Sequence, residues 1–223
     1  ILRNHLQPER GEPSARTTDG VFPIGRTADD PLGYAYDATG SSRPYDPLRA
    51  FVLAKLAESN APADKPLVLA HPPTATAAKA CRRIAFYLEK VGLRVELRPT
   101  AADDAPTSAD AADLTYVVVS SSEPLVDVWR WFGPGGLMNL DSRALDAALQ
   151  QTAEAESFAA ARAALFDVQR VLHDEALVVP LWQLPEHAVW RSRVVPPADT
   201  VPTSLYQQVE RLQILPQFNE ELP

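Results

Sequence analysis

Cysteine, long apolar runs and clusters of positive charge are scarce in this chain of 223 residues. Its single cysteine, Cys81, excludes an internal disulfide and a cysteine-based metal cluster. No stretch reaches the roughly 18 uninterrupted apolar residues that a membrane-spanning helix needs, so we expect no membrane span. The 29 acidic residues outnumber the 21 basic ones, and no run of five Lys or Arg residues occurs. Nucleic-acid binding through a basic patch is therefore disfavoured.

Sequence signatures of catalysis are also missing. There is no G-x-S-x-G elbow, no phosphate-binding loop and no H-E-x-x-H pair. The consecutive serines from Ser120 to Ser122 have no neighbouring histidine that could activate them. His173, Asp174 and Glu175 follow one another and would point to different faces of a helix, which is poor metal geometry. We therefore expect no catalytic residue, no metal ligand and no cofactor.

The composition supports a folded core, because 46% of the residues are hydrophobic, enough for one large domain or two small ones. The sequence begins at Ile1 with neither Met nor a signal pattern, which we expect of a processed product or a part of a longer protein. Residues 1–45 are rich in proline and show no sustained period, which predicts an extended segment lying over a surface. Its tyrosines, Tyr34, Tyr36 and Tyr45, would cover apolar surface or stack on a ligand, and covering is favoured.

A helix is predicted over residues 46–58. The Asp-Pro pair at its start combines a favoured N-cap with a residue suited to the first helical position. Leu48, Val52 and Leu56 recur every fourth residue and indicate one apolar stripe.

The clearest pattern is a strand, a helix and a strand in succession. Residues 66–71 (PLVLAH) are typical of a short strand, and residues 74–91 carry apolar side chains at the spacing of a helix face. Gly92 ends that helix, and residues 93–97 (LRVEL) alternate as a half-buried strand does. The three elements predict a βαβ unit with parallel strands and a right-handed crossover. Cys81 lies on the apolar face of the helix and is interpreted as a buried core residue.

Residues 114–119 (LTYVVV) form a continuous apolar run, which predicts a third strand buried on both faces. A short helix should follow from Pro124 and turn Val128, Trp131 and Phe132 inward. A glycine-rich stretch then ends it.

Two more helices are predicted over residues 141–154 and 157–174, each with a capping residue at its start. The second has a narrow apolar stripe, formed by Phe158, Ala161, Leu165, Val168 and Leu172. Residues 177–190 (LVVPLWQLPEHAVW) then predict a buried strand on which the rest of the chain docks. Its two prolines place it at a sheet edge or a bulge. We expect it to cross between two packed bodies.

The order of these pieces resembles the C-terminal half of extracellular solute-binding proteins of family 5, the dipeptide and oligopeptide type. Residues 43–60 (RPYDPLRAFVLAKLAESN) resemble the YDP helix of that family. Residues 67–97 are similar to its strand, its helix with a KVG-type end and its following strand. Residues 161–183 (ARAALFDVQRVLHDEALVVPLWQ) are similar to its helix that ends in a P-x-x-P-L strand, and this match is the most specific.

The resemblance covers residues 1–213 and implies an α/β fold, a periplasmic-binding-protein-like (type II) lobe with βαβ units. Beyond the extended N-terminal segment over residues 1–45, it implies an α/β ligand-binding lobe over residues 46–176. Residues 177–223 would form a C-terminal segment that returns to the other lobe. This other lobe, the N-terminal lobe of the family, does not occur in the sequence. We therefore expect a polypeptide outside this sequence to supply it.

Candidate ligand-binding residues lie where the third predicted strand ends, because ligands in open α/β sheets bind outside the carboxyl ends of the strands. A helix N-terminus at that place suits an anionic group. Ser120, Ser121, Ser122 and Glu123 would hold a ligand carboxylate or carbonyl there, or merely cap the helix. Asp127 lies one turn beyond Glu123. The resemblance implies that one of these two carboxylates holds a ligand ammonium group, and a solvated helix face is the alternative.

Three tryptophans, Trp129, Trp131 and Trp182, are candidates for a cleft wall, although tryptophans at helical spacing more often belong to the core. We select Trp129 and Trp182 as ligand-binding candidates.

Taken with the resemblance, these residues predict a non-catalytic protein that captures a solute, such as a short peptide, for the permease of an ABC-type importer. Closure of two lobes about a hinge would be the mechanism. The expected location is periplasmic or extracellular and associated with a membrane, with the cytoplasm as the alternative. Two rival functions stay open: the ligand-sensing domain of a DNA-binding transcriptional regulator, and a degenerate module that only binds a protein partner.

Overall fold

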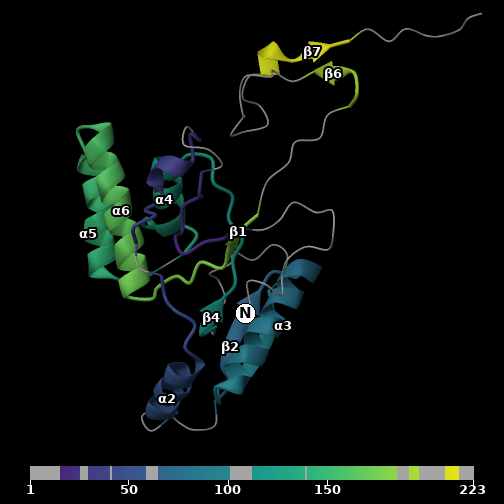
Figure 1. Ribbon diagram of the computed structural model, residues 1–223, viewed down its shortest axis with the longest axis vertical. Coiled ribbons are helices and arrows are strands. Elements are labelled where there is room, and N and C mark those ends of the chain that lie inside the picture. Colours follow the sequence, from purple (N-terminus) through teal and green to yellow (C-terminus); the bar gives the residue numbers. More distant parts are fainter. Residues whose placement is uncertain are drawn as a thin grey trace, which may run out of the picture.

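Figure 1 shows the computed structural model of the chain, which describes residues 16–25, 30–40, 42–58, 65–100, 112–138, 140–184, 191–195 and 209–215. Within these residues, a small parallel sheet with a covering helix lies next to a layer of three helices. The fold is therefore of the mixed α/β class that the sequence predicts.

The sheet has three parallel strands in the order β3-β2-β4. The strands are β2 (Leu67–His71), β3 (Val95–Pro99) and β4 (Leu114–Thr115). Leu67 lies opposite Val95, and Leu69 lies opposite Leu114. Helix α3 (Ala75–Lys90) joins β2 to β3. The predicted βαβ unit with parallel strands is confirmed, although β3 begins at Val95 rather than at residue 93.

Helix α3 begins and ends where its sequence predicts. The Thr74 hydroxyl accepts a hydrogen bond from the Ala77 N–H at 3.2 Å, and Gly92 takes a φ of 96° just beyond the helix. The inner face of α3 meets the sheet in a buried group that we call the sheet cluster. Its members are Leu69, Ala77, Ala80, Cys81 and Tyr116. Cys81 is thus a core residue, as predicted.

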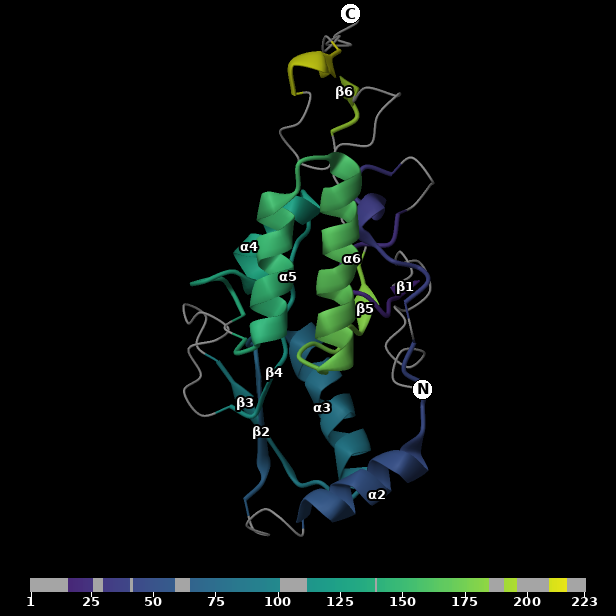
Figure 2. The ribbon, with the colours of Figure 1, turned by 90° about the vertical axis from the view of Figure 1, so that its left-hand side faces the viewer.

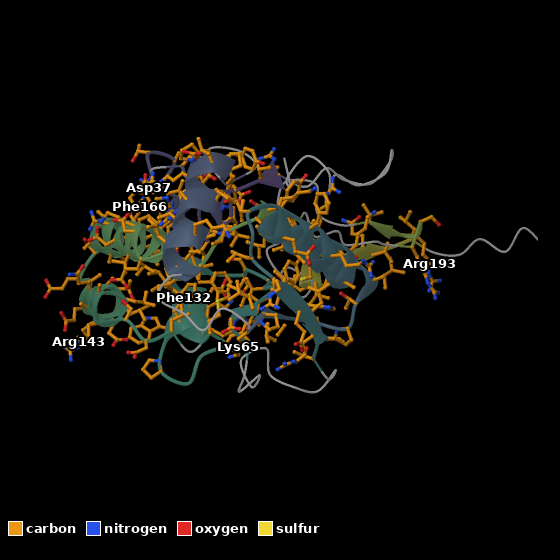
Figure 3. The ribbon with its side chains drawn as sticks, turned by 90° about the horizontal axis from the view of Figure 1, so that it is seen from below. Asp37, Lys65, Phe132, Arg143, Phe166 and Arg193 are labelled. Carbon is orange, nitrogen blue, oxygen red and sulfur yellow. The ribbon has the colours of Figure 1, made fainter. Side chains whose placement is uncertain are left out.

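The helical layer consists of α4 (Pro124–Phe132), α5 (Arg143–Glu154) and α6 (Phe158–Asp174). The hydroxyls of Ser142 and Ser157 accept hydrogen bonds from the third residues after them and cap α5 and α6. The two capped helices lie side by side (Figure 2). Figure 3 labels Phe132, which is buried at the end of α4, and Arg143, which is exposed at the start of α5.

A second and larger buried group, the helical cluster, joins this layer to the N-terminal segment. Its members are Phe22, Ala35, Val128, Trp131, Phe132, Leu145, Ala148, Leu149, Leu165, Val168 and Leu172. The inward orientation predicted for the three aromatic and apolar residues of α4 is confirmed. The stripe of α6 is also confirmed except at Phe158, which is 63% exposed. Residues 1–45 were predicted only to cover a surface, yet Phe22 is fully inside the core.

Helix α2 (Pro47–Glu58) forms as predicted, with Asp46 Oδ1 accepting a hydrogen bond from the Arg49 N–H at 2.9 Å. Its apolar stripe does not pack inward, however. Leu48, Val52 and Leu56 are 73%, 48% and 60% exposed. Among the described side chains of α2, only Ala54 is buried. Periodicity predicts the helix correctly, but it says nothing about which surface the helix meets.

The third strand is shorter and more open than predicted. Only Leu114 and Thr115 pair with β2, and Leu114 and Val118 are 42% and 62% exposed. The prediction that residues 114–119 are buried on both faces is therefore wrong. The physical reason is position, because β4 lies at the edge of the sheet and only Tyr116 reaches the sheet cluster.

The predicted strand over residues 177–190 is also wrong over much of its length. Within its described part, residues 177–184, only β5 (Trp182–Gln183) is a strand, and it pairs antiparallel with β1 (Arg16–Thr17). Pro180 has no N–H to contribute to a ladder, and residues 185–190 lie outside the described residues. The predicted crossing between two packed bodies stays a prediction, although the segment does contact both buried clusters. Leu177 and Val178 pack on the helical cluster, and Leu181 and Trp182 pack on the sheet cluster.

The last described elements are β6 (Val194–Val195), the short helix η2 (Val209–Arg211) and β7 (Gln213–Ile214). β6 and β7 pair antiparallel and lie apart from both clusters (Figure 1). Another short helix, η1 (Gly33–Ala35), packs against α6. The boundaries predicted at residues 45 and 176 stay predictions.

Candidate ligand-binding site

The loop from Ser120 to Glu123 follows β4 and leads into α4, as the sequence predicts. Glu123 is the N-cap, with extended backbone angles and a side-chain Oε1 that accepts a hydrogen bond from the Leu125 N–H at 3.0 Å. Pro124 occupies the first helical position, where its missing N–H costs nothing. The loop therefore stops at a well-formed helix start.

Asp127 is the most buried polar residue of this site, with 0% of its side chain exposed. Its Oδ2 accepts hydrogen bonds from the Ser121 hydroxyl at 2.9 Å, the Ser122 N–H at 2.7 Å and the Glu123 N–H at 3.0 Å. A buried carboxylate needs such donors to offset its lost hydration. Asp127 therefore holds the loop in shape from inside.

Arg130 balances the charge of Asp127. Its Nη2 lies 2.8 Å from Asp127 Oδ1 and donates a hydrogen bond to the Ser120 carbonyl at 2.7 Å. Asp127 Oδ1 accepts no hydrogen bond with suitable geometry, so its contact with the Arg130 guanidinium is an ion pair. Both oxygens of Asp127 thus face groups of this loop and helix. An ammonium group of a ligand would have to displace them.

Tyr34 reaches this loop from the N-terminal segment. Its hydroxyl donates a hydrogen bond to Glu123 Oε1, and its ring lies 5.0 Å from that of Phe158. Burial raises the pKa of Tyr34 above its ordinary range, and the Glu123 carboxylate raises it further. The sequence favours Tyr34 as a cover for apolar surface, and Tyr34 does pack on the helical cluster. The contact with Glu123 has no signal in the local sequence.

The backbone donors of the α4 N-terminus are all occupied. Pro124 has no N–H, the Leu125 N–H goes to the Glu123 side chain, and the N–H groups of Val126 and Asp127 go to the Glu123 carbonyl. An anion placed here, as the sequence predicts, would find no free amide in the first turn. The side chain of Glu123 already fills that role.

The two selected tryptophans do not form a common wall. Trp129 donates its Nε1–H to the Thr152 hydroxyl at 3.0 Å and packs on the helical cluster. Trp182 packs on the sheet cluster, with its ring 6.1 Å from that of Tyr116. Both rings therefore serve packing in this structure, and Trp131 is almost fully buried.

What the loop offers to solvent is a small polar face. Ser120 and Ser122 are exposed, Ser121 and Glu123 are partly exposed, and Arg130 flanks them. Such a face suits hydrogen bonding to a polar solute. Among the described residues, no group of three His, Cys, Asp or Glu side chains could hold a metal ion. No helix in the described parts of the chain is long and apolar enough to cross a membrane.

The sheet, the βαβ unit and the helical layer together form part of a type II periplasmic-binding-protein fold, as solved structures show. The ABC transporter substrate-binding protein CtaP of Listeria monocytogenes overlaps 96% of this chain and 46% of its own, with a TM-score of 0.65 and 14% identity. The overlap with a substrate-binding protein of Microbacterium hydrocarbonoxydans covers 81% of this chain and 38% of that protein, with a TM-score of 0.58 and 16% identity. The overlap with lactococcal OppA, which was solved with an endogenous peptide, covers 76% of this chain and 35% of OppA, with a TM-score of 0.55 and 18% identity.

These identities are low, so the similarity establishes the fold alone. No protein-family model matches the sequence, and no curated protein matches it. The chain spans less than half the length of each of the three solved structures. Their names describe binding proteins rather than enzymes.

Proposed function

We propose that this chain is part of a solute-binding protein that captures a short peptide or a similar small solute and delivers it to the permease of an ABC importer. The observation that supports this most is the overlap of 96% of the chain with an ABC transporter substrate-binding protein. The chain would supply one lobe and a segment that returns to the other lobe. The second lobe would come from outside these 223 residues.

In this proposal the solute contacts the polar face of the loop after β4. The hydroxyls of Ser120 and Ser122 and the partly exposed carboxylate of Glu123 would bind its polar groups. Asp127 would act through the loop, because its carboxylate holds the backbone of Ser122 and Glu123 in place. Closure of two lobes by a hinge motion would then exclude water from the bound solute.

The proposed location is the periplasm or the outside of the cell, where importers of this class collect their solutes. A degenerate protein-binding module would capture no solute, whereas a ligand-sensing domain of a regulator would also bind one. Solute capture is thus the property that separates a binding protein from a degenerate module.

Native mass spectrometry of the gently purified chain, compared with the same sample denatured, provides the test. We expect adducts of a few hundred daltons that disappear on denaturation and sequence as peptides. The Glu123→Gln variant should lose most of the adduct signal. A matched variant, Glu154→Gln at the exposed end of α5, should keep it. A bare mass for the chain, also after incubation with a library of dipeptides and tripeptides, would overturn the proposal for this chain.

A further inference from the structure

Strand β3 lies at the outer edge of the parallel sheet, because the strand order is β3-β2-β4 (Figure 2). It pairs with β2 on one side, from Val95 to Pro99, and no other described strand pairs with its second side. Every other strand that ends a sheet in the described residues has only two residues, whereas β3 has five. An edge strand of this kind can pair with a strand of another chain.

The hydrogen bonds between β2 and β3 show which backbone groups face outward. The Thr100 N–H, just after β3, donates to the His71 carbonyl at 2.9 Å. Since the backbone groups of a strand alternate in direction, every second residue before Thr100 faces β2 as well. The residues between them, Val95, Leu97 and Pro99, therefore direct their backbone groups away from β2.

These outward groups match an antiparallel copy of themselves. The N–H groups of Val95 and Leu97 make no hydrogen bond with any described residue, and Pro99 offers only its carbonyl. When two copies of β3 are centred on Leu97, the two Leu97 residues exchange both of their hydrogen bonds. Each Val95 N–H then meets the Pro99 carbonyl of the other copy. Every outward N–H of the strand is satisfied in this register.

The charged side chains of β3 select the same register independently. Val95 and Leu97 pack on the sheet cluster beneath α3, so Glu96 and Arg98 lie on the opposite face of the sheet. Their side chains are 51% and 41% exposed, and Arg98 Nη2 lies 3.1 Å from Glu96 Oε1. In the pairing centred on Leu97, each Glu96 lies opposite Arg98 of the other copy. A parallel pairing in register would place like charges side by side, which is destabilising.

We propose that this chain forms a two-fold symmetric dimer through β3, in which two three-stranded sheets join into one sheet of six strands. The interface is isologous, so it closes on itself and uses up the edge of both copies. The ladder is short and ends at Pro99, which makes the association reversible. The dimer involves no residue of the loop after β4 and does not depend on the proposed solute capture.

Sedimentation equilibrium of the purified chain, from micromolar to millimolar concentration, measures the association. We expect a reversible equilibrium between monomer and dimer. Glu96→Arg and Arg98→Glu each place like charges opposite one another at two positions of the dimer, so each should raise the dissociation constant about tenfold. The double variant, Glu96→Arg with Arg98→Glu, restores opposite charges and should return to within about threefold of the unmodified chain.

The exposed pair of Asp167 and Arg170 on α6 provides matched controls. Its side chains are 38% and 66% exposed, and their charged atoms lie 2.7 Å apart. Asp167→Arg and Arg170→Glu change the net charge by the same amounts as the two β3 variants, but they leave the sheet edge untouched. Both should keep the dissociation constant of the unmodified chain. Circular dichroism of all variants verifies that they are folded.

Disulfide formation between two different variants tests the register itself. In a Cys81→Ala background, a Glu96→Cys chain is mixed with an Arg98→Cys chain and gently oxidised. Opposite residues of this type have Cα atoms about 4.5 Å apart, which a disulfide can span. The two Glu96 positions lie diagonally, roughly 7–8 Å apart, which is too far. Linked dimers should therefore form in the mixture and not in either variant alone.

A chain that stays monomeric up to millimolar concentration overturns the proposal. It is also overturned if the double variant associates no better than the single variants, if the α6 variants weaken the dimer equally, or if either cysteine variant alone links as well as the mixture. None of these results bears on peptide adducts at the loop after β4. Failure of the dimer and failure of the transport proposal are thus distinguishable.

Discussion

The hydroxyl of Tyr34 donates a hydrogen bond to Glu123 Oε1, although 89 residues separate them in the chain. The same Glu123 oxygen accepts the Leu125 N–H and caps α4. One carboxylate oxygen therefore ties the N-terminal segment to the helix start. The shape of the candidate loop depends on a residue far from it in sequence.

Replacing Tyr34 by Phe removes this tie while keeping the ring that packs on Phe158. We expect a loss of about 1.5–3 kcal/mol in the free energy of unfolding, the usual value of a hydrogen bond to a charged group. Urea unfolding followed by circular dichroism measures it. Tyr36→Phe is the control, because the Tyr36 hydroxyl makes no hydrogen bond to a described residue. Equal losses in the two variants would show that the Tyr34 contact contributes nothing.

Two Asp–Arg pairs of the same spacing differ in burial and allow a matched comparison. Asp127 is buried and pairs with Arg130, whereas Asp167 is 38% exposed and pairs with Arg170 at 2.7 Å. Asp127→Asn places an amide against donors of its own loop, so we expect a loss of about 2–4 kcal/mol. Asp167→Asn should cost less than about 1 kcal/mol. Chemical denaturation of both variants checks this, and similar losses would contradict the buried role of Asp127.

Apolar residues with the same helical periodicity should differ widely in their contribution to stability. Leu165 is fully buried in the helical cluster, and Leu56 on α2 is 60% exposed. We expect Leu165→Ala to cost about 2–5 kcal/mol, since it leaves a cavity in a packed core. Leu56→Ala should stay within about 0.5 kcal/mol. Thermal unfolding of the two variants under identical conditions measures the difference, and a large loss at Leu56 would mean that α2 packs in solution.

Alkaline pH should destabilise the protein through buried acids. Burial raises the pKa of Cys81 from 9.0 to about 11, and burial with the neighbouring Cys81 raises that of Tyr116 from 10.0 to about 12. Because the unfolded chain releases these protons first, the stability is fully present below about pH 9 and falls as the pH rises toward 12. Urea unfolding between pH 7 and pH 10.5 measures the slope.

Cys81→Ala should remove the part of that decline that begins near pH 9. A slope that this substitution leaves unchanged would contradict the shifted thiol. For the same reason the native protein should react with a thiol reagent at pH 8 only as fast as it opens. Complete reaction within the mixing time would show that Cys81 is accessible.

The parts of the fold that the sequence predicts correctly are those with local causes. Thr74, Ser142 and Ser157 cap their helices through contacts three residues away, and Gly92 ends α3 through its own backbone angle. The βαβ unit follows from such signals together with the period of its apolar residues. Each of these interactions joins residues that lie within one or two helical turns of each other, so a short sequence pattern can predict it.

The parts that the sequence predicts poorly depend on neighbours that only the fold supplies. Leu48 and Val118 belong to patterns that indicate burial, but α2 faces solvent on that side and β4 lies at a sheet edge. Phe22 has no periodic context and still lies in the helical cluster. The predicted anion site at α4 has its first-turn donors occupied by the side chain and the carbonyl of Glu123. The residue type at the helix start predicts the cap, but only the structure shows which donors the cap occupies.

The burial of Phe22 in the helical cluster determines how early this cluster can fold while the chain is being synthesised. Its partners Leu165 and Leu172 lie on α6, so the cluster cannot close until that helix has been made. At about 5–20 residues per second, the ribosome needs roughly 8–30 s to move from Phe22 to Leu172. The aromatic ring stays without its native neighbours for that time. The nascent chain thus exposes apolar surface until α6 has been made.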